Sequence, residues 1–371
     1  MNFDFSPEQE QFRDQVRRFL EESDGLSEGR SILNEKTRDF SASIWEGLAE
    51  LGVQAAAIPE AHAGLGLGML ELCVAAHEIG RVLAPVPFLS SIGVCAEAIR
   101  RFGSAEQKSK WLPGLANGSI IGTWGYAEDD RGGPMQPSRL SAGKLVGAKE
   151  PVLDGMVARV MIVVAATPQN TPVLMLCGLE QAAVTRQPVK TVDPTRPAAR
   201  IQFNAADAQP LPGGDADAWR KLLDQAAVLL AFEQLGAAES ALAMACDYAQ
   251  DRVAFGRKIG SFQAVKHRLA DMYAKIELAR CHCYYGAWAI STDAPEAPLA
   301  AAGARCSATD AFEFAAQESI QLHGGIGVTW ESKCHQFYRR SRLSALILGS
   351  RFEWQDRLVD ELEGQLQRSE H

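Results

Sequence analysis

Three cations stand close together in the stretch 252–263, and their chemistry is that of an anion-binding turn. Arg252, Arg257 and Lys258 carry the charges, and two glycines in the same stretch interrupt any helix. The chain as a whole is acidic, with a net charge of -9 at pH 7. A local basic turn on an acidic protein suits a bound anion such as a phosphate. A solvated connection between helices is the alternative interpretation.

Two helical patterns must position this turn. Apolar residues recur at three- and four-residue spacing over 222–250 and again over 264–290. A later helical pattern reaches Gln321, and the paired glycines Gly324 and Gly325 follow it. Paired glycines are commonly a helix C-cap, although they also let phosphates approach the backbone closely.

The remaining pattern predicts an α+β protein of three domains. Helices fill 1–119, where Ser6 caps the first helix and Pro7 fits its first position. Short runs rich in Val and Ile, separated by turn residues, predict a small β-domain over 120–215, and helices return over 216–371. Further predicted helices are 42–51, 70–82, 92–102 and 105–112; predicted strands are 144–146, 160–166, 173–179, 183–189 and 200–203; the predicted linker is 204–216.

Length and composition exclude several classes of protein. A chain of 371 residues, 47% hydrophobic and 22% charged, is ordinary for a soluble protein of two or three domains. A pI near 5.4 argues against nucleic acid or an anionic membrane as the main partner. The first residues include acids where a secretory signal would be basic, and no apolar run approaches the roughly 18 residues that span a bilayer. We therefore expect a cytoplasmic protein without a membrane span.

The eight cysteines predict no metal site. They are scattered through apolar helical stretches, as expected of small core residues in a reducing compartment. Cys281, His282 and Cys283 are adjacent, but neighbours on a helix point in different directions and no second ligand pair stands at zinc spacing.

The basic stretch resembles a motif of the acyl-CoA dehydrogenase family. In that family an R-x-x-F-G-x-x-x-x-x-x-Q pattern lies against FAD, and Arg252, Phe255 and Gln263 match it position for position. The family contacts reach a flavin that a neighbouring subunit holds. The resemblance therefore implies that the stretch acts as a clamp.

A second family motif, Q-x-x-G-G, lies beside the adenosine and pyrophosphate of FAD and is matched by Gln321, Gly324 and Gly325. The family's P-E-x-x-x-G-x-G-x-G turn is matched at 59–68, so the resemblance runs from end to end. It implies an N-terminal helical domain, a middle β-barrel or sandwich domain and a C-terminal four-helix bundle. It also implies FAD as cofactor, an acyl-CoA substrate and an electron-transfer flavoprotein or similar acceptor.

The family's catalytic base is missing from both of its usual positions. Family members remove the α-proton of an acyl-CoA with a carboxylate while the β-hydride goes to the flavin. One position of that carboxylate is occupied here by Leu348 and the other by Ala226, and both are apolar. Glu233, on an apolar stretch of helix, is the best remaining candidate. A bond to a neighbouring helix is the more common role for a buried Glu.

The predicted β-domain also departs from the family. The T-E-P-x-x-G-S-D segment that cups the flavin is altered at 127–134, and Pro151 replaces the Trp that stacks on the flavin ring. These losses affect a subunit's own flavin, whereas the retained clamp serves a flavin bound mostly elsewhere. The pattern resembles the smaller subunit of hetero-oligomeric acyl-CoA dehydrogenases for bulky or dicarboxylic chains, of the steroid-side-chain or pimeloyl-CoA type. We expect a homologous catalytic partner, in a heterodimer or an α2β2 heterotetramer.

Two alternatives remain. A self-sufficient homo-oligomeric dehydrogenase would need another base, such as Glu233. A non-catalytic scaffold without flavin would account for the missing base, but it would not account for the retained clamp.

Overall fold

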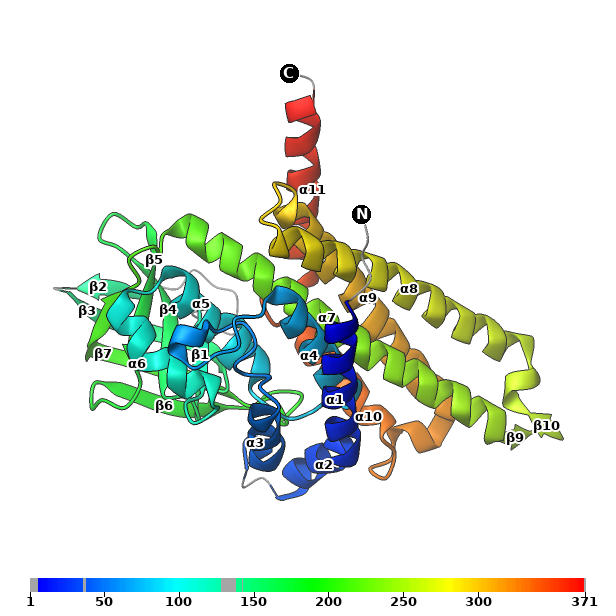
Figure 1. Ribbon diagram of the computed structural model, residues 1–371. Coiled ribbons are helices and arrows are strands. Elements are labelled where there is room, and N and C mark those ends of the chain that lie inside the picture. The colour runs from blue at the N-terminus through cyan, green and yellow to red at the C-terminus, as the bar shows by residue number, and fades with distance from the viewer. Residues whose placement is uncertain (1–5, 36–37, 128–137, 142, 370–371) are drawn as a thin grey trace. The chain divides into compact units, whose positions relative to one another are not determined.

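Two compact units make up the computed structural model, which describes residues 6–35, 38–127, 138–141 and 143–369. The first unit comprises Met1–Ser27, Cys73–Ala84 and Ala227–His371. The second unit comprises Glu28–Leu72 and Pro85–Ala226. Figure 1 shows the helices and strands in chain order, from the blue N-terminal helices through the green strands to the red C-terminal helix.

Helices occupy both ends of the chain, as predicted. The α-helices are α1 (Pro7–Glu22), α2 (Gly25–Glu35), α3 (Ala42–Glu50), α4 (Met69–Arg81), α5 (Glu97–Phe102), α6 (Ala105–Ala116), α7 (Ala216–Asp251), α8 (Gln263–Ser291), α9 (Ala297–His323), α10 (Cys334–Ser344) and α11 (Arg351–Ser369). The shorter helical turns are η1 (Glu60–His62), η2 (Leu89–Ala96), η3 (Ile259–Ser261) and η4 (Gly324–Val328).

The start of α1 confirms the predicted cap. The Ser6 hydroxyl accepts a hydrogen bond from the Gln9 backbone N–H at 3.2 Å, and the Gln9 side chain accepts one from the Ser6 N–H at 2.9 Å. Pro7 occupies the first helical position, where its missing N–H costs nothing. Val16 and Leu20 then bury the apolar face of the helix.

A single curled sheet forms the middle of the chain and confirms the predicted β-region. Its strand order is β6-β7-β3-β2-β4-β5-β8, and β1 pairs in parallel with β4. The strands are β1 (Gly122–Gly125), β2 (Arg139–Ser141), β3 (Lys144–Leu153), β4 (Val160–Ala166), β5 (Pro172–Gly178), β6 (Val184–Val189), β7 (Ala198–Ala206) and β8 (Ala208–Pro210).

The predicted linker 204–216 is wrong over its first half. β7 continues to Ala206, and β8 pairs with β5 through Met175 opposite Pro210. Pro210 is tolerated because β8 lies at the edge of the sheet, where a missing N–H breaks no ladder. Proline-rich composition alone therefore concealed an edge strand.

In the described part of the chain, α7 is the one helix that is both long and apolar enough to be compared with a membrane span. By length and composition it could cross a membrane, but 72% of its most apolar window is buried inside the protein. Packing accounts for this burial, because Leu222, Leu230 and Leu235 are each fully buried.

A buried charge cluster ties four helices of the first unit together. His77 on α4 lies 3.0 Å from Glu78 through Nδ1 and 3.0 Å from Glu239 on α7 through Nε2. Arg17 on α1 donates two hydrogen bonds to Glu78, at 2.9 and 2.8 Å, and Arg280 on α8 pairs with Glu239 at 3.1 Å. The cluster holds α1 against the helices that carry the candidate site.

This cluster predicts a stability optimum in mildly acidic solution. Burial alone would raise the pKa of Glu78, but hydrogen bonds from His77 and Arg17 outweigh it and lower the pKa from 4.5 to about 2. Its contribution, on the order of 3 kcal/mol, is present above pH 4.5 and is lost as the pH falls toward about 2. Burial would lower the pKa of His77, but the two carboxylates raise it above 6.5. That contribution is complete below 6.5 and is lost as the pH rises through the raised value.

Urea unfolding at a series of pH values measures how the free energy of unfolding changes on the acid and the alkaline side of this optimum. His77→Gln should remove the loss of stability on the alkaline side, and Glu78→Gln should remove the loss on the acid side. A wild-type curve that stays flat on both sides would contradict the assignment.

Candidate functional site

The basic stretch forms a β-hairpin that presents an aromatic ring to solvent. Strand β9 (Val253–Ala254) pairs antiparallel with β10 (Arg257–Lys258), with Phe255 and Gly256 between them. Their φ angles are 51° and 77°, the positive values that a two-residue hairpin turn requires. A bulky side chain rarely adopts this conformation, and the Phe255 ring is 96% exposed. A strained and exposed aromatic is typical of a residue held for contact with something outside its own chain.

Arg252 joins this hairpin to α7. Its backbone N–H donates to the Tyr248 carbonyl at 2.9 Å, and its own carbonyl accepts from the Ile259 N–H at 2.8 Å. These two bonds close the base of the hairpin. The Arg252 side chain is exposed, and within the described residues its guanidinium has no ion-pair partner. Its charge is therefore available to an anion.

Arg257 is used differently from Arg252, although it lies on the same hairpin. Its guanidinium stacks over the Phe262 ring, 4.0 Å from the ring centre. Phe262 in turn meets Phe255 edge to face, with ring centres 6.3 Å apart. Arg257 therefore supports the aromatic tip of the hairpin.

The paired glycines lie at the end of α9. Gly324 has a φ of 62° and ends the helix, and η4 follows it. A Cβ atom added to Gly324 or Gly325 would meet nothing within 4 Å. Close packing within the chain therefore does not require these glycines, and their exposed backbone leaves room for a ligand to approach.

Two adjacent grooves bring the hairpin and the glycines together. The smaller, of about 450 Å³, includes Arg252, Gly324 and Gly325 in its lining. The larger, of about 720 Å³, includes Phe255 and Gln321. Ile259 and Leu322 line both grooves, so they form a shared wall.

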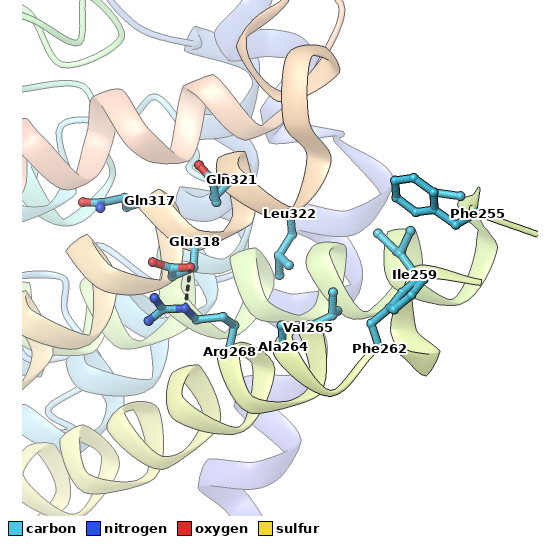
Figure 2. Close-up of a pocket in the computed structure, with 11 residues that line it drawn as sticks. Phe255, Ile259, Phe262, Ala264, Val265, Arg268, Gln317, Glu318, Gln321 and Leu322 are labelled. Carbon is cyan, nitrogen blue, oxygen red and sulfur yellow. Dashed lines mark ion pairs between the residues drawn. The ribbon is translucent and has the colours of Figure 1, made fainter. Parts of the chain in front are cut away.

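Figure 2 shows the larger groove, with Phe255, Ile259 and Phe262 on the hairpin side and Gln317 and Gln321 on α9. Five of the six residues predicted to contact a cofactor thus lie around one end of the helical unit. The sixth, Gln263, lies outside both groove linings and is exposed at the start of α8.

An ion pair that the sequence reasoning missed crosses the larger groove. Arg268 on α8 lies 3.5 Å from Glu318 on α9, and the Glu318 side chain is only 10% exposed (Figure 2). The pair neutralises the acid on this wall. The smaller groove has no carboxylate in its lining within the described residues, and Arg252 and His323 both line it. Positive charge with open glycine backbone fits a diphosphate.

Both expected positions of a catalytic base are apolar and buried. Leu348 lies between α10 and α11 with a φ of 66°, and 4% of its side chain is exposed. Its carbonyl accepts a hydrogen bond from the Trp354 indole at 2.9 Å, which fixes the backbone there. Ala226 on α7 is 1% exposed.

Glu233, the candidate replacement base, makes a buried ion pair. Its Oε1 lies 3.2 Å from Nη1 of Arg340, and the two side chains are 4% and 1% exposed. Arg340 also donates to the Leu83 carbonyl at 3.4 Å. The pair links α7 to α10, a geometry that favours a structural role for this carboxylate.

The position of the missing tryptophan lies on β3. Pro151 is exposed there, and the pairing of β3 with β7 shifts register between Lys149 and Val152. A proline has no N–H for the ladder and is often found at such a bulge. Of the altered segment 127–134, residues 128–134 lie outside the described part of the chain.

Comparison with known families defines the class of this protein. Residues 6–119 match "Acyl-CoA dehydrogenase, N-terminal domain" and residues 216–352 match "Acyl-CoA dehydrogenase, C-terminal domain". Acyl-CoA dehydrogenase IpdE2 of Mycobacterium tuberculosis is 37% identical over 331 residues, which cover 88% of each protein. The chain therefore belongs to the acyl-CoA dehydrogenase family, whose members are FAD-dependent oxidoreductases.

Two solved structures narrow the comparison. The ChsE4-ChsE5 complex from Mycobacterium tuberculosis contains a chain with a TM-score of 0.90 and 27% identity, covering 98% of this chain and 99% of that one. The Tcur3481-Tcur3483 steroid ACAD contains a chain with a TM-score of 0.88 and 29% identity, covering 97% and 98%. Both share the fold along nearly the whole length of this chain.

Proposed function

We propose that this chain is the flavin-clamping subunit of a hetero-oligomeric acyl-CoA dehydrogenase that desaturates an acyl-CoA between its α and β carbons. One observation carries the proposal. Phe255 is held in a strained conformation on an exposed hairpin, while Leu348 and Ala226 occupy the expected base positions. The chain retains the residues expected to contact a partner's flavin, and it has no carboxylate at the positions expected to deprotonate a substrate of its own.

The groove residues, together with Gln263 outside the grooves, divide the binding of FAD between them. Arg252 supplies a cation to the diphosphate, and the backbone at Gly324 and Gly325 admits it closely. Gln321 and Gln263 supply neutral hydrogen bonds, and Phe255 supplies an apolar face. Bound FAD would supply the hydride acceptor of the reaction. Neither Leu348 nor Ala226 can accept the α-proton, so the partner supplies the base.

The related structures support a homologous partner and a bulky substrate. One is the ChsE4-ChsE5 complex and the other is the Tcur3481-Tcur3483 steroid ACAD. We infer by similarity a heterodimer or α2β2 heterotetramer acting on a steroid-type acyl-CoA in the cytoplasm. An electron-transfer flavoprotein or similar acceptor would reoxidise the flavin.

Flavin content tests this assignment directly. The chain purified alone should be colourless, and it should acquire stoichiometric FAD when it is co-expressed with a homologous subunit that carries the base. A yellow, active preparation of the lone chain would favour the homo-oligomer instead. A mixed complex that never binds FAD would favour the scaffold.

Arg252→Ala should weaken FAD binding to the assembled complex by roughly ten- to a hundred-fold. The substitution removes a charge-assisted hydrogen bond of about 1.5–3 kcal/mol. Gln263→Ala should weaken binding less, because a neutral hydrogen bond contributes about 0.5–1.5 kcal/mol. FAD titration beside a sizing measurement separates loss of flavin from loss of assembly.

Lys258→Ala is the matched control for this series. It removes the same charge from the same hairpin, but Lys258 is exposed on β10 and lies outside both groove linings. FAD affinity should stay closer to wild type than in Arg252→Ala. Equal losses in the two variants would indicate a diffuse charge effect and would remove the specific role of Arg252.

A further inference from the structure

His323 lies in the smaller groove in a fixed orientation. It is the last residue of α9, and its Nδ1 lies 2.7 Å from the Ser319 carbonyl oxygen. Its ring stacks on Tyr248 of α7, with centres 4.1 Å apart and planes inclined by 23°. Nδ1 must carry a proton to donate to that carbonyl. The ring therefore cannot rotate away from the groove without losing both contacts.

The surroundings of the ring favour a positive charge. Burial lowers the pKa of His323, but hydrogen bonds with the Cys334 thiol and the Ser319 carbonyl outweigh burial and raise the pKa above 6.5. The C-terminal end of a helix also favours a cation. Among the described residues, the titratable groups beside the ring are Tyr248 from α7 and Cys334 from α10, and Arg252 lines the same groove.

We propose that His323 is a second anion-binding residue of this site, which contacts the diphosphate beside Arg252 and is positioned by Ser319 and Tyr248. The proposal rests on the clamp proposed above and adds a titratable contact to it. Its consequence is a dependence on pH that Arg252 cannot produce, since a guanidinium stays charged throughout. Affinity for a diphosphate of constant charge falls as the pH rises through the pKa of His323.

The test uses this chain assembled with its partner and freed of flavin, together with ADP-ribose, a diphosphate diester whose own charge does not change near neutrality. Calorimetry at about pH 6 and about pH 9 brackets the titration of the imidazole. Wild-type affinity should fall by roughly ten-fold between them, the equivalent of one hydrogen bond to a charged group. His323→Gln should bind equally at both pH values, at the weaker level. His267→Gln, on the exposed face of α8, is the matched control and should behave as wild type.

An NMR titration of the His323 ring tests the proposal without measuring an affinity. The ring C–H signal that disappears in His323→Gln identifies His323 by NMR, and its shift against pH reports its pKa. Cys334→Ser should move this midpoint to lower pH, because it replaces the thiol that raises the pKa. Millimolar ADP-ribose should move the midpoint to higher pH, since an anion stabilises the imidazolium.

The outcomes separate this proposal from the clamp. If Arg252→Ala weakens the binding of ADP-ribose, and the affinity of His323→Gln still depends on pH, the role proposed for His323 is wrong and the clamp is supported. If neither substitution changes binding, and ADP-ribose leaves the His323 signal unmoved, both are wrong.

Discussion

The purified chain alone should oxidise acyl-CoA thioesters at a rate lower by about 10²- to 10⁴-fold than the assembled enzyme, the usual cost of a missing general base. Leu348 and Ala226 cannot take up a proton, and the ion pair with Arg340 leaves Glu233 poorly placed to do so. The measurement is dye reduction by a panel of acyl-CoA thioesters, with excess FAD added to the lone chain.

Leu348→Glu sharpens this comparison, because it returns a carboxylate to an expected base position. It should not restore turnover to the lone chain, since Pro151 stands where the family resemblance places the Trp that stacks on the flavin ring. Flavin reduction in this single variant would show that the ring is held well enough without that contact. Strong turnover by the unmodified chain would contradict the division of labour itself.

Breaking the buried pair of Glu233 and Arg340 should cost about 3–5 kcal/mol of unfolding free energy. Either Glu233→Ala or Arg340→Ala removes one half of this ion pair, whose side chains are 4% and 1% exposed. Replacing both residues with apolar ones should cost much less than the sum of the single changes, because the two halves of the pair are then removed together. Chemical denaturation of the four proteins in the cycle measures this coupling.

Lys333→Ala provides the control for a surface pair in the same unit. Lys333 lies 3.8 Å from Asp24 with both side chains about half exposed, so its loss should change stability by less than about 1 kcal/mol. Glu233→Gln in the assembled enzyme then decides the remaining role of that residue. A large loss of turnover with unchanged stability would make Glu233 a catalytic base and would contradict the proposal that the partner supplies it.

Periodicity predicted the fold well where elements are long. The patterns over 222–250 and 264–290 correspond to α7 and α8, whose ends differ by one residue except that α7 begins at Ala216. The pattern Val160–Ala166 corresponds to β4. It missed β1, because Gly122 and Gly125 lower strand propensity. Their role is close packing: an added Cβ would lie 2.5 Å from Cys95 at Gly122 and 2.3 Å from Met161 at Gly125.

The candidate site shows a different limit. The sequence alone showed that Leu348 and Ala226, two apolar residues, occupy the positions where the family resemblance places a carboxylate. The hairpin was not foreseen, since two-residue strands have no period and nothing in the sequence marks Phe255 for a positive φ. His323 was passed over as a variable position of a motif. Its partners Tyr248 and Cys334 lie on other helices, and only the folded chain brings them to it.

The exposed hairpin tip has a consequence for how cells maintain this protein. Phe255 is 96% exposed and Val253 is 56% exposed, so an unassembled copy carries an apolar tip with no cover from its own chain. Chaperones and proteases act on such surfaces, and sticky tips promote aggregation. In the proposed hetero-oligomer, surplus copies would then be cleared faster than assembled ones, and degradation as well as synthesis would set the ratio of the two subunits.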